Sequence, residues 1–518
     1  MIIYLNNISN VISTPAKSGI NSGRNLINYW EKISQSPQGM PMAEDSFEMT
    51  FRYLQITIWI LSLLTIILIN SNVTFAQQNK LITVIGDSLV GKMVNGESTR
   101  EVYGNVVITQ GDVIINCDKA IHFISRNEAE LIGNVVARKD TLTIKTPRGF
   151  YYGNLSKTRS NAGVFLDDKK VILTADSGEY YFDEDRAFFE SKVRLYDTTT
   201  TLTSNELTYF QQQNRAVAIG DVLIIDADNQ IIADTLEHFR NTKITFAFSN
   251  VRLTNLKNNS EIYGEHLEDY RNRGYSLIDV KPLFVQVDTS YVVREDSTEE
   301  VQLDTLFIKS RIMEAYRDSS QRFFAIDSVS ILKSDFASKN DLTVFYRSED
   351  KIITKKISES ARQPVLWQET SQLTGDSITI YLDDNNIKQL DVDGTSFMLS
   401  QNVNYAERYD QTSSSQIKIF FIDNKINRAE FFGNVYSIYF MYDGETKNGL
   451  TKSNSAETTV MFEDNEVTEV KLYKNPASEY YPENQVNGNE KSYLLPRFVI
   501  LQNKPTKEEM YNLLNELR

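Results

Sequence analysis

Hydrophobic and polar positions alternate along most of the chain in a pattern that returns every 29 residues. One marker pairs a small residue with a polar residue or proline. It recurs without a slip as Cys117-Asp118, Thr146-Pro147, Ala175-Asp176, Ser204-Asn205 and Ala233-Asp234. A second marker, typified by Gly133-Asn134-Val135, keeps the same step from Gly104 to Val251. Self-similarity at a fixed step is the sequence signature of a repeat array.

Each copy is expected to contribute two strands of about 10–12 residues, because polar turn signals fall twice per copy. Both strands carry a break near their middle, one at the Asp118-type position and one at the Gly133-Asn134 type. Glycine and asparagine tolerate the backbone angles of bulges and sharp bends. The pattern therefore predicts an all-β protein, a long array of antiparallel strands bent into a V whose two faces enclose an apolar interior.

Large apolar residues occupy fixed columns of the repeat and define the expected interior. Five residues after the Asp118-type position stand Phe123, Tyr152, Tyr181, Phe210 and Phe239. A valine column holds Val135, Val164, Val193, Val222 and Val251. Two residues after four of these valines stand Leu166, Leu195, Ile224 and Leu253. A step of two keeps side chains on one face of a strand, so these columns predict one core running through all the repeats.

The pattern also divides the chain. The uncharged run Leu54–Ile69 follows Arg52 and precedes small residues, which predicts a signal peptide at 49–76 cleaved after Ala76; an uncleaved anchor is the alternative. Residues 1–48 are interpreted as a non-native extension from an early start codon. The remaining expected segments are repeats at 77–284, an acidic loop or junction at 285–305, a divergent repeat segment at 306–475, and a proline-containing linker with a short helix at 476–518.

Composition narrows the possible chemistry. The net charge of −15 argues against nucleic-acid binding. The single cysteine, Cys117, excludes an intrachain disulfide and a cysteine-based zinc site, and three histidines leave little room for histidine-dependent catalysis. Cys117 stands in a column of small residues, and His122 and His238 stand in a column of tyrosines. We therefore expect packing roles for all three and predict no catalytic residue, metal or cofactor. The alternatives are a reactive thiol at Cys117 and cation binding by the Asp118 column.

Four segments carry a resemblance to a known family. GDSLVGK, YGNVVITQGDVIINCDKA, LIGNVVARKD and AIGDVLIIDAD begin at Gly86, Tyr103, Leu131 and Ala218. Together with the signal-like segment, they resemble the OstA-like family, which includes the periplasmic lipopolysaccharide-transport protein LptA and the N-terminal domain of the outer-membrane protein LptD. The resemblance is good over 82–255 and loose over 256–475. It implies a V-shaped β-jellyroll that holds lipopolysaccharide acyl chains between its two faces.

The resemblance also implies partners and a location. The implied partners are lipopolysaccharide, other OstA-like transport proteins joined by strand-edge stacking, and an LptD-like outer-membrane partner. The implied location of the protein is the periplasm, with a possible association with the outer membrane. Under this reading the aromatic, valine and leucine columns become candidate lipid contacts, although ordinary core packing would select the same residues. A secreted structural or adhesive repeat protein remains an alternative. A polysaccharide-acting β-solenoid enzyme is another, but no column holds two acidic residues across three successive copies.

Overall fold

The computed structural model describes residues 81–518, apart from 95, 258, 294–298, 320, 335, 384–385, 423–424 and 464–465. The proposed extension 1–48 and signal segment 49–76 lie outside the described residues. Among the described residues, no helix is both long and apolar enough to cross a membrane.

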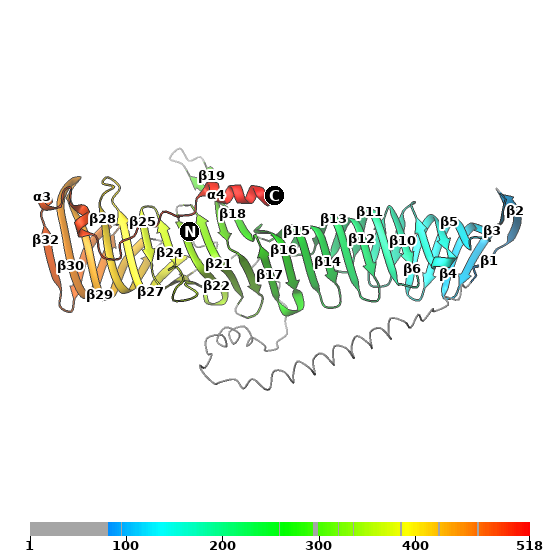
Figure 1. The fold of residues 1–518 in the computed structure, drawn as a ribbon, viewed down its shortest axis with the longest axis horizontal. Helices are drawn as coiled ribbons and strands as arrows, with labels where there is room; N and C mark the ends of the chain where they lie inside the picture. The colour runs from blue at the N-terminus through cyan, green and yellow to red at the C-terminus, as the bar shows by residue number, and fades with distance from the viewer. Residues whose placement is uncertain are drawn as a thin grey trace, which may run out of the picture. The chain divides into compact units, whose positions relative to one another are not determined.

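The described residues form one array of antiparallel strands, arranged in chain order (Figure 1). The first half contains β1 (Thr83–Ile85), β2 (Ser88–Val94), β3 (Glu97–Gln110), β4 (Val113–Phe123), β5 (Glu128–Lys139), β6 (Leu142–Tyr152), β7 (Lys157–Ser160), β8 (Val164–Asp167), β9 (Ile172–Ala175), β10 (Ser177–Tyr181), β11 (Arg186–Tyr196), β12 (Thr201–Phe210), β13 (Arg215–Ile225), β14 (Asn229–Phe239), β15 (Ile244–Asn255) and β16 (Glu261–Tyr270).

The second half continues in the same manner. It contains β17 (Tyr275–Val280), β18 (Leu283–Val293), β19 (Glu299–Lys309), β20 (Ile312–Tyr316), β21 (Arg322–Lys333), β22 (Phe336–Tyr346), β23 (Lys351–Lys355), β24 (Val365–Gln368), β25 (Ser371–Thr374), β26 (Ser377–Asp383), β27 (Asn386–Gln401), β28 (Tyr409–Ile422), β29 (Lys425–Asp443), β30 (Thr446–Glu463), β31 (Glu466–Tyr473) and β32 (Ala477–Tyr481). Short 3-10 turns follow β6, β16 and β22. The expected all-β array of antiparallel strands is confirmed.

Most strands are divided near the middle by a corner. The pairing of β5 with β6 shifts register between Ile132 and Val135, and the pairing of β13 with β14 shifts between Ile219 and Val222. Elsewhere the corner splits one strand into two short ones, as in β7 and β8. Each divided strand therefore has two halves, which we call its limbs, and the array has two rows of turns at the limb tips.

The stretch 285–305, expected to be a loop or junction, is instead largely paired strand. β18 pairs with β19 from Leu283–Lys309 to Val293–Glu299, and β16 pairs with β18 on one side while β19 pairs with β21 on the other. The array therefore runs through this stretch as a long hairpin. Near its base the two strands carry consecutive buried apolar residues, Leu283–Val285 and Leu306–Ile308, and residues 294–298 of the acidic run lie outside the described residues.

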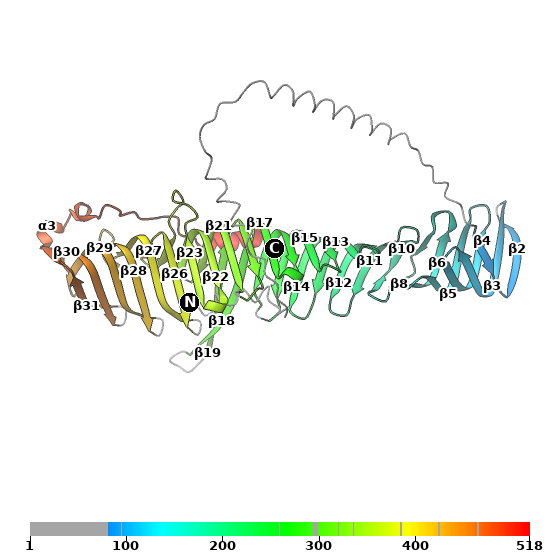
Figure 2. The same cartoon turned by 90° about the horizontal axis from the view of Figure 1, so that it is seen from below.

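The chain ends in a tail that runs back along the array (Figure 2). It contains α3 (Glu483–Val486), a 3-10 turn (Glu490–Tyr493) and α4 (Lys507–Glu516), the last lying where a helix was expected. The Thr506 side chain caps α4 by accepting a hydrogen bond from the Glu509 N–H. Gln372 holds the extended part: its side chain donates to the Val499 carbonyl and accepts from the Leu501 N–H, both at 2.9 Å.

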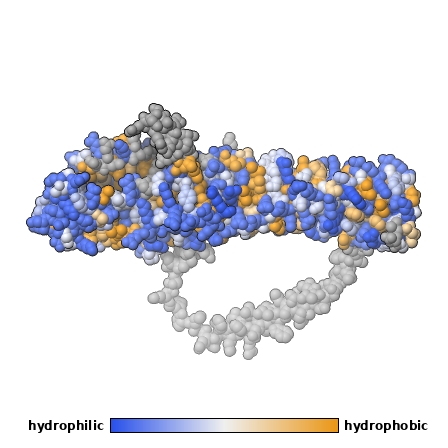
Figure 3. All heavy atoms as spheres, turned by 90° about the horizontal axis from the view of Figure 1, so that it is seen from above, coloured by the Kyte–Doolittle hydropathy of each residue, from blue (hydrophilic) through white to orange (hydrophobic). Residues whose placement is uncertain are grey.

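The tail covers an outer apolar surface in the second half of the array. Met510, Leu514 and Leu517 pack against a buried cluster formed by Tyr263, Leu283, Val285, Phe307, Leu332, Ala337, Val365 and Trp367. The strands beneath α4 are thus apolar on both faces, whereas β12 carries Thr201, Thr203 and Thr208 on its outer face. Hydrophilic residues dominate the face seen in Figure 3.

Candidate functional site: the interior and its mouth

The corners are built from consecutive residues with positive φ. Gly133 has φ of 78° and Asn134 has φ of 44°, and Asp118 of the neighbouring strand lies opposite them. The Asn134 side-chain amide donates to Asp118 Oδ2 at 2.9 Å. Equivalent amide–carboxylate contacts join Asn105 to Asp87, Asn250 to Asp234 and Asn205 to Asp221. These contacts support a bend-forming role for the Asp118 column.

The valine and leucine columns line the interior between the limbs. All nine residues, from Val135 to Leu253, are between 0 and 8% exposed. They belong to one buried cluster that runs from Ile82 in front of β1 to Val435 in β29. The structure therefore brings these candidates together along the array, packed side chain against side chain.

The aromatic column lies elsewhere. Phe123, Tyr152, Tyr181, Phe210 and Phe239 are half-buried and absent from the buried cluster. Cations cover their rings: the guanidinium of Arg126 lies 4.3 Å from the Phe123 centroid and that of Arg186 lies 4.4 Å from the Tyr181 centroid. The structure corrects the expected position of this column. Inward positions in β4 run Val113, Ile115, Cys117 and then Ala120, so the corner consumes an extra residue and reverses the alternation that follows.

The tyrosines one position earlier, which share the column of His122 and His238, point inward instead. Tyr151, Tyr180 and Tyr209 are at most 2% exposed, and burial raises the pKa of each phenol. The Tyr209 hydroxyl donates to Asp168 Oδ2 at 2.7 Å, and the Tyr151 hydroxyl donates to Gln110 Oε1 at 2.5 Å. These bonds join one row of turns to the other.

Further polar contacts join the two rows of turns. We call the boundary between these two rows the mouth of the interior. Gln110 donates to the Gly153 carbonyl at 2.9 Å, and Lys139 Nζ lies 3.0 Å from Asp185 Oδ1. Arg271 of one row forms an ion pair with Asp226 of the other. The sequence signal for the mouth was a constant separation between partners, 41 residues for both Gln110–Tyr151 and Asp168–Tyr209.

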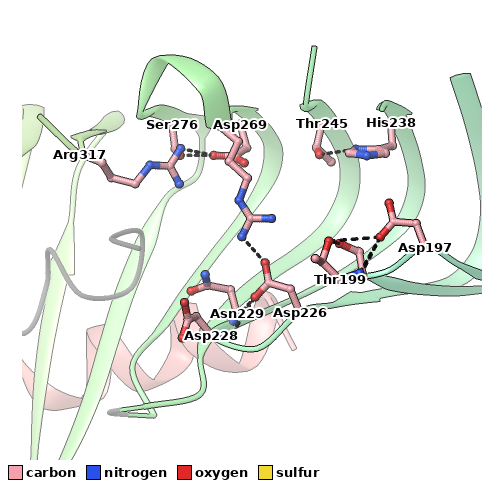
Figure 4. A network of polar contacts seen from close by, with 12 residues as sticks. Asp197, Thr199, Asp226, Asp228, Asn229, His238, Thr245, Asp269, Ser276 and Arg317 are labelled. Carbon is pink, nitrogen blue, oxygen red and sulfur yellow. Dashed lines mark hydrogen bonds and ion pairs between the residues drawn. The ribbon is translucent and has the colours of Figure 1, made fainter. Parts of the chain in front are cut away.

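One part of the mouth holds a cavity of about 100 Å³. Figure 4 shows Asp197, Thr199, Asp226 and Asn229 in one row facing His238, Thr245, Asp269, Ser276 and Arg317 in the other. The cavity reaches down to Ile224 and Leu253, two of the interior candidates, and it is also lined by Arg240, Lys243 and Arg271. An apolar floor and a charged rim therefore meet at this place.

Electrostatics in this cavity follow from burial and pairing. Burial lowers the pKa of His238 to about 4, so the ring is neutral near pH 7. For Asp226, burial opposes ionisation, but hydrogen bonds from the N–H groups of Asp228 and Asn229 and from Arg271 bring the net pKa below its usual value. Arg317 pairs with Asp269 at 2.8 Å.

The remaining candidate side chains have structural partners. Cys117 Sγ lies 3.2 Å from the Lys119 carbonyl, and burial raises the pKa of its thiol to about 11, which disfavours a reactive thiolate. His122 is buried and His266 Nδ1 lies 2.7 Å from Asp279. Within the described ranges, no three His, Cys, Asp or Glu side chains are grouped to hold a metal ion.

The first strands leave an edge at the N-terminal end of the array. In the described part of the chain, β1 and β2 pair only with β3. Ile85, Leu89, Val90 and Met93 on this edge are at least 44% exposed. Exposed apolar strand edges are templates for pairing with another chain.

Comparison with known proteins confirms the family resemblance. Residues 78–234 match the family model described as OstA-like protein. Among solved structures, the chain is similar to LptH of Pseudomonas aeruginosa, the LptA-homologous periplasmic component of that organism's lipopolysaccharide transport device. The match has 17% identity, covers 33% of this chain and 83% of that one, and has a TM-score of 0.12, which supports no detailed comparison of the folds. No curated protein matches the chain.

Proposed function

We propose that this protein binds lipopolysaccharide and carries it through the periplasm towards the outer membrane, without catalysis, as one module in a bridge of OstA-like proteins. In this proposal the bent strands form a V-shaped β-jellyroll of 29-residue repeats. Acyl chains lie between the limbs, along the valine and leucine columns. The OstA-like match at 78–234 supports the family role, and the carrying observation is the continuous buried apolar cluster that runs from Ile82 to Val435.

The energetics are compatible with a cargo that opens the mouth. Each buried CH₂ contributes about 0.8 kcal/mol, so one saturated chain of about twelve carbons gains roughly 9 kcal/mol. Breaking one hydrogen bond to a carboxylate across the mouth costs about 1.5–3 kcal/mol. An acyl chain can therefore offset the loss of several contacts such as Tyr209–Asp168 while it replaces side-chain packing in the interior.

The edge of β1 and β2 supports docking to a sister module or to an LptD-like partner. Its exposed apolar side chains suit a strand added from outside. At the other end, β31 carries Glu469 and Lys471, paired at 2.6 Å, on a largely exposed strand. Charged side chains on an edge discourage unspecific pairing, so the two ends are suited to different neighbours.

Photo-crosslinking tests the cargo. A photoreactive amino acid at Val222, which faces the interior, is expected to form lipopolysaccharide adducts. The matched control is Phe210 on the preceding strand, half-buried on the opposite face, where few adducts are expected. Adducts at Phe210 with none at Val222 would contradict transport through the interior. No adducts at either position, in a folded protein, would favour the structural or adhesive alternative.

A further inference from the structure

The mouth cavity lies where a repeated contact is interrupted. In two copies a buried tyrosine reaches across the mouth to the residue 41 positions earlier, as Tyr151 to Gln110 and Tyr209 to Asp168. The copy between them is closed by the Lys139–Asp185 pair, whereas the Tyr180 hydroxyl donates to Gln211 Oε1 at 2.6 Å. Hydrogen-bonded side chains thus hold the two rows of turns together up to this point.

In the next copy the tyrosine is replaced by His238, and its counterpart 41 positions earlier is Asp197. The shorter imidazole turns to Thr245, with 2.9 Å between His238 Nδ1 and Thr245 Oγ1. Asp197 Oδ1 accepts instead from the N–H groups of Thr199 and Thr200 in its own turn, at 3.0 and 2.9 Å. The cavity is the space between these two retracted groups.

Two buried polar atoms at the cavity have no hydrogen-bond partner among the described residues. They are Arg240 Nε and Asn229 Oδ1. Arg240 Nε lies 3.8 Å from Asp197 Oδ2, an ion-pair distance too long for a hydrogen bond. Arg240 Nη2 already donates to the Lys170 carbonyl at 3.1 Å. An unsatisfied buried donor is costly, so Arg240 has hydrogen-bonding capacity at Nε for a group in the cavity.

The charge of the lining favours an anion. Arg240, Lys243, Arg271 and Arg317 face Asp197, Asp226 and Asp269, with His238 neutral, which leaves one positive charge in excess. The whole chain carries −15. Arginine is suited to phosphate because its planar guanidinium offers two parallel donors.

We propose that the mouth cavity binds the phosphate-type headgroup of the carried lipid, with Arg240 as the principal contact and the lipid chain directed onto Ile224 and Leu253. This inference rests on the proposed function and adds a specific recognition point to it. At His238 the tyrosine bond across the mouth is missing, which leaves an opening for a headgroup beside the Arg271–Asp226 ion pair, whereas the Tyr151 and Tyr209 copies are closed by direct bonds. The cargo is then held at a fixed position by its headgroup and along the interior by its chains.

Two matched amphiphiles test the site: hexadecyl phosphate and 1-hexadecanol, with inorganic phosphate as a third probe, measured by calorimetric titration of the full chain. The wild type is expected to bind hexadecyl phosphate at least tenfold more tightly than hexadecanol. His238→Tyr fills the cavity and offers Asp197 a cross-mouth donor, so it is expected to remove this preference while hexadecanol binding remains. Arg240→Gln tests the same preference without adding bulk, and Arg186→Gln, on the outer face over Tyr181, is the charge-matched control.

The outcomes separate this inference from the function on which it rests. Equal binding of both amphiphiles by the wild type overturns the headgroup site and leaves lipid carriage intact. Failure of both amphiphiles to bind overturns lipid carriage itself. Binding of inorganic phosphate as tight as that of hexadecyl phosphate identifies a site for free anions and overturns the assignment to a lipid headgroup. Should His238→Tyr fail to fold, an unchanged preference in Arg240→Gln overturns the role of Arg240.

Discussion

Replacing Gly133 by alanine tests the corner that divides each strand into limbs. Gly133 has φ of 78°, and a Cβ added there would lie 2.3 Å from Asp118 Oδ2 and 2.9 Å from Asp118 Cβ. Contacts this short force the Asp118 carboxylate to move away from Asn134. Gly163 is the matched control, because it has φ of 85° and an added Cβ would meet no atom within 4 Å.

The two variants share one energetic cost and differ in another. A residue with a Cβ in the left-handed region costs about 1–2 kcal/mol, and this is the whole expected effect of Gly163→Ala. Gly133→Ala also loses the Asn134–Asp118 hydrogen bond, worth about 0.5–1.5 kcal/mol. Its total is therefore roughly 1.5–3.5 kcal/mol, which corresponds to a factor of roughly 10–300 in a local opening equilibrium.

Hydrogen exchange measured by mass spectrometry is the appropriate assay, because repeat arrays open locally and a single unfolding free energy need not describe them. Peptides from β5 and β6 should exchange faster in Gly133→Ala by that factor, while peptides from β28 and β29 stay unchanged. The double variant Gly133→Ala with Asp118→Ala should recover the part of the loss that is due to the steric contact. Exchange no faster in Gly133→Ala than in Gly163→Ala would refute the role assigned to Asp118.

Two further predictions concern pH and the tail. Burial lowers the pKa of His238 from 6.5 to about 4; the nearby Asp197 carboxylate raises this pKa and Arg240 lowers it further. The folded state therefore binds a proton at His238 less readily than the unfolded chain does. The contribution of His238 to the free energy of unfolding should thus be complete above pH 6.5 and fall by up to about 3 kcal/mol as the pH drops towards 4. His238→Gln should flatten this part of a plot of the urea midpoint against pH. An unchanged slope in this variant would contradict the prediction. Met510→Asp places a carboxylate at a fully buried position of α4 and should release the tail, seen as faster proteolysis after Val499, whereas the exposed substitution Glu508→Gln should have no effect.

Much of the fold could be predicted from side-chain alternation and spacing. The strands, the corners at Gly133-Asn134 and the helix at Lys507 all have local causes, namely period-two burial, positive φ and a capping threonine. The face of the strand on which Phe123 lies could not be predicted from period-two alternation, because the corner inserts an extra residue and reverses the alternation that follows. Local rules of alternation hold only between corners.

The candidate site was less accessible from sequence. The valine column was found because every copy contributes to it. The mouth cavity depends on Asp197 and His238, which are brought together across the interior and carry no local motif. The column of Tyr151, Tyr180 and Tyr209 was visible, but its hydrogen bonds to the opposite turns required the three-dimensional register. The replacement of tyrosine by histidine acquires a meaning only once those bonds are known.

The tail that closes over the second half of the array has a consequence for the order in which the protein matures. Arg518 contacts Tyr263, its neighbour across 255 positions of the chain, and the apolar outer surface between them stays bare until α4 has been synthesised. The strands up to β15 contribute no residue to this cluster and can reach their final packing before α4 docks. In the later strands, Phe307 and Trp367 stay exposed to solvent and to any chaperone or neighbouring chain until α4 covers them. The packing of the strands from β16 to β24 is thus completed only when α4 docks on them.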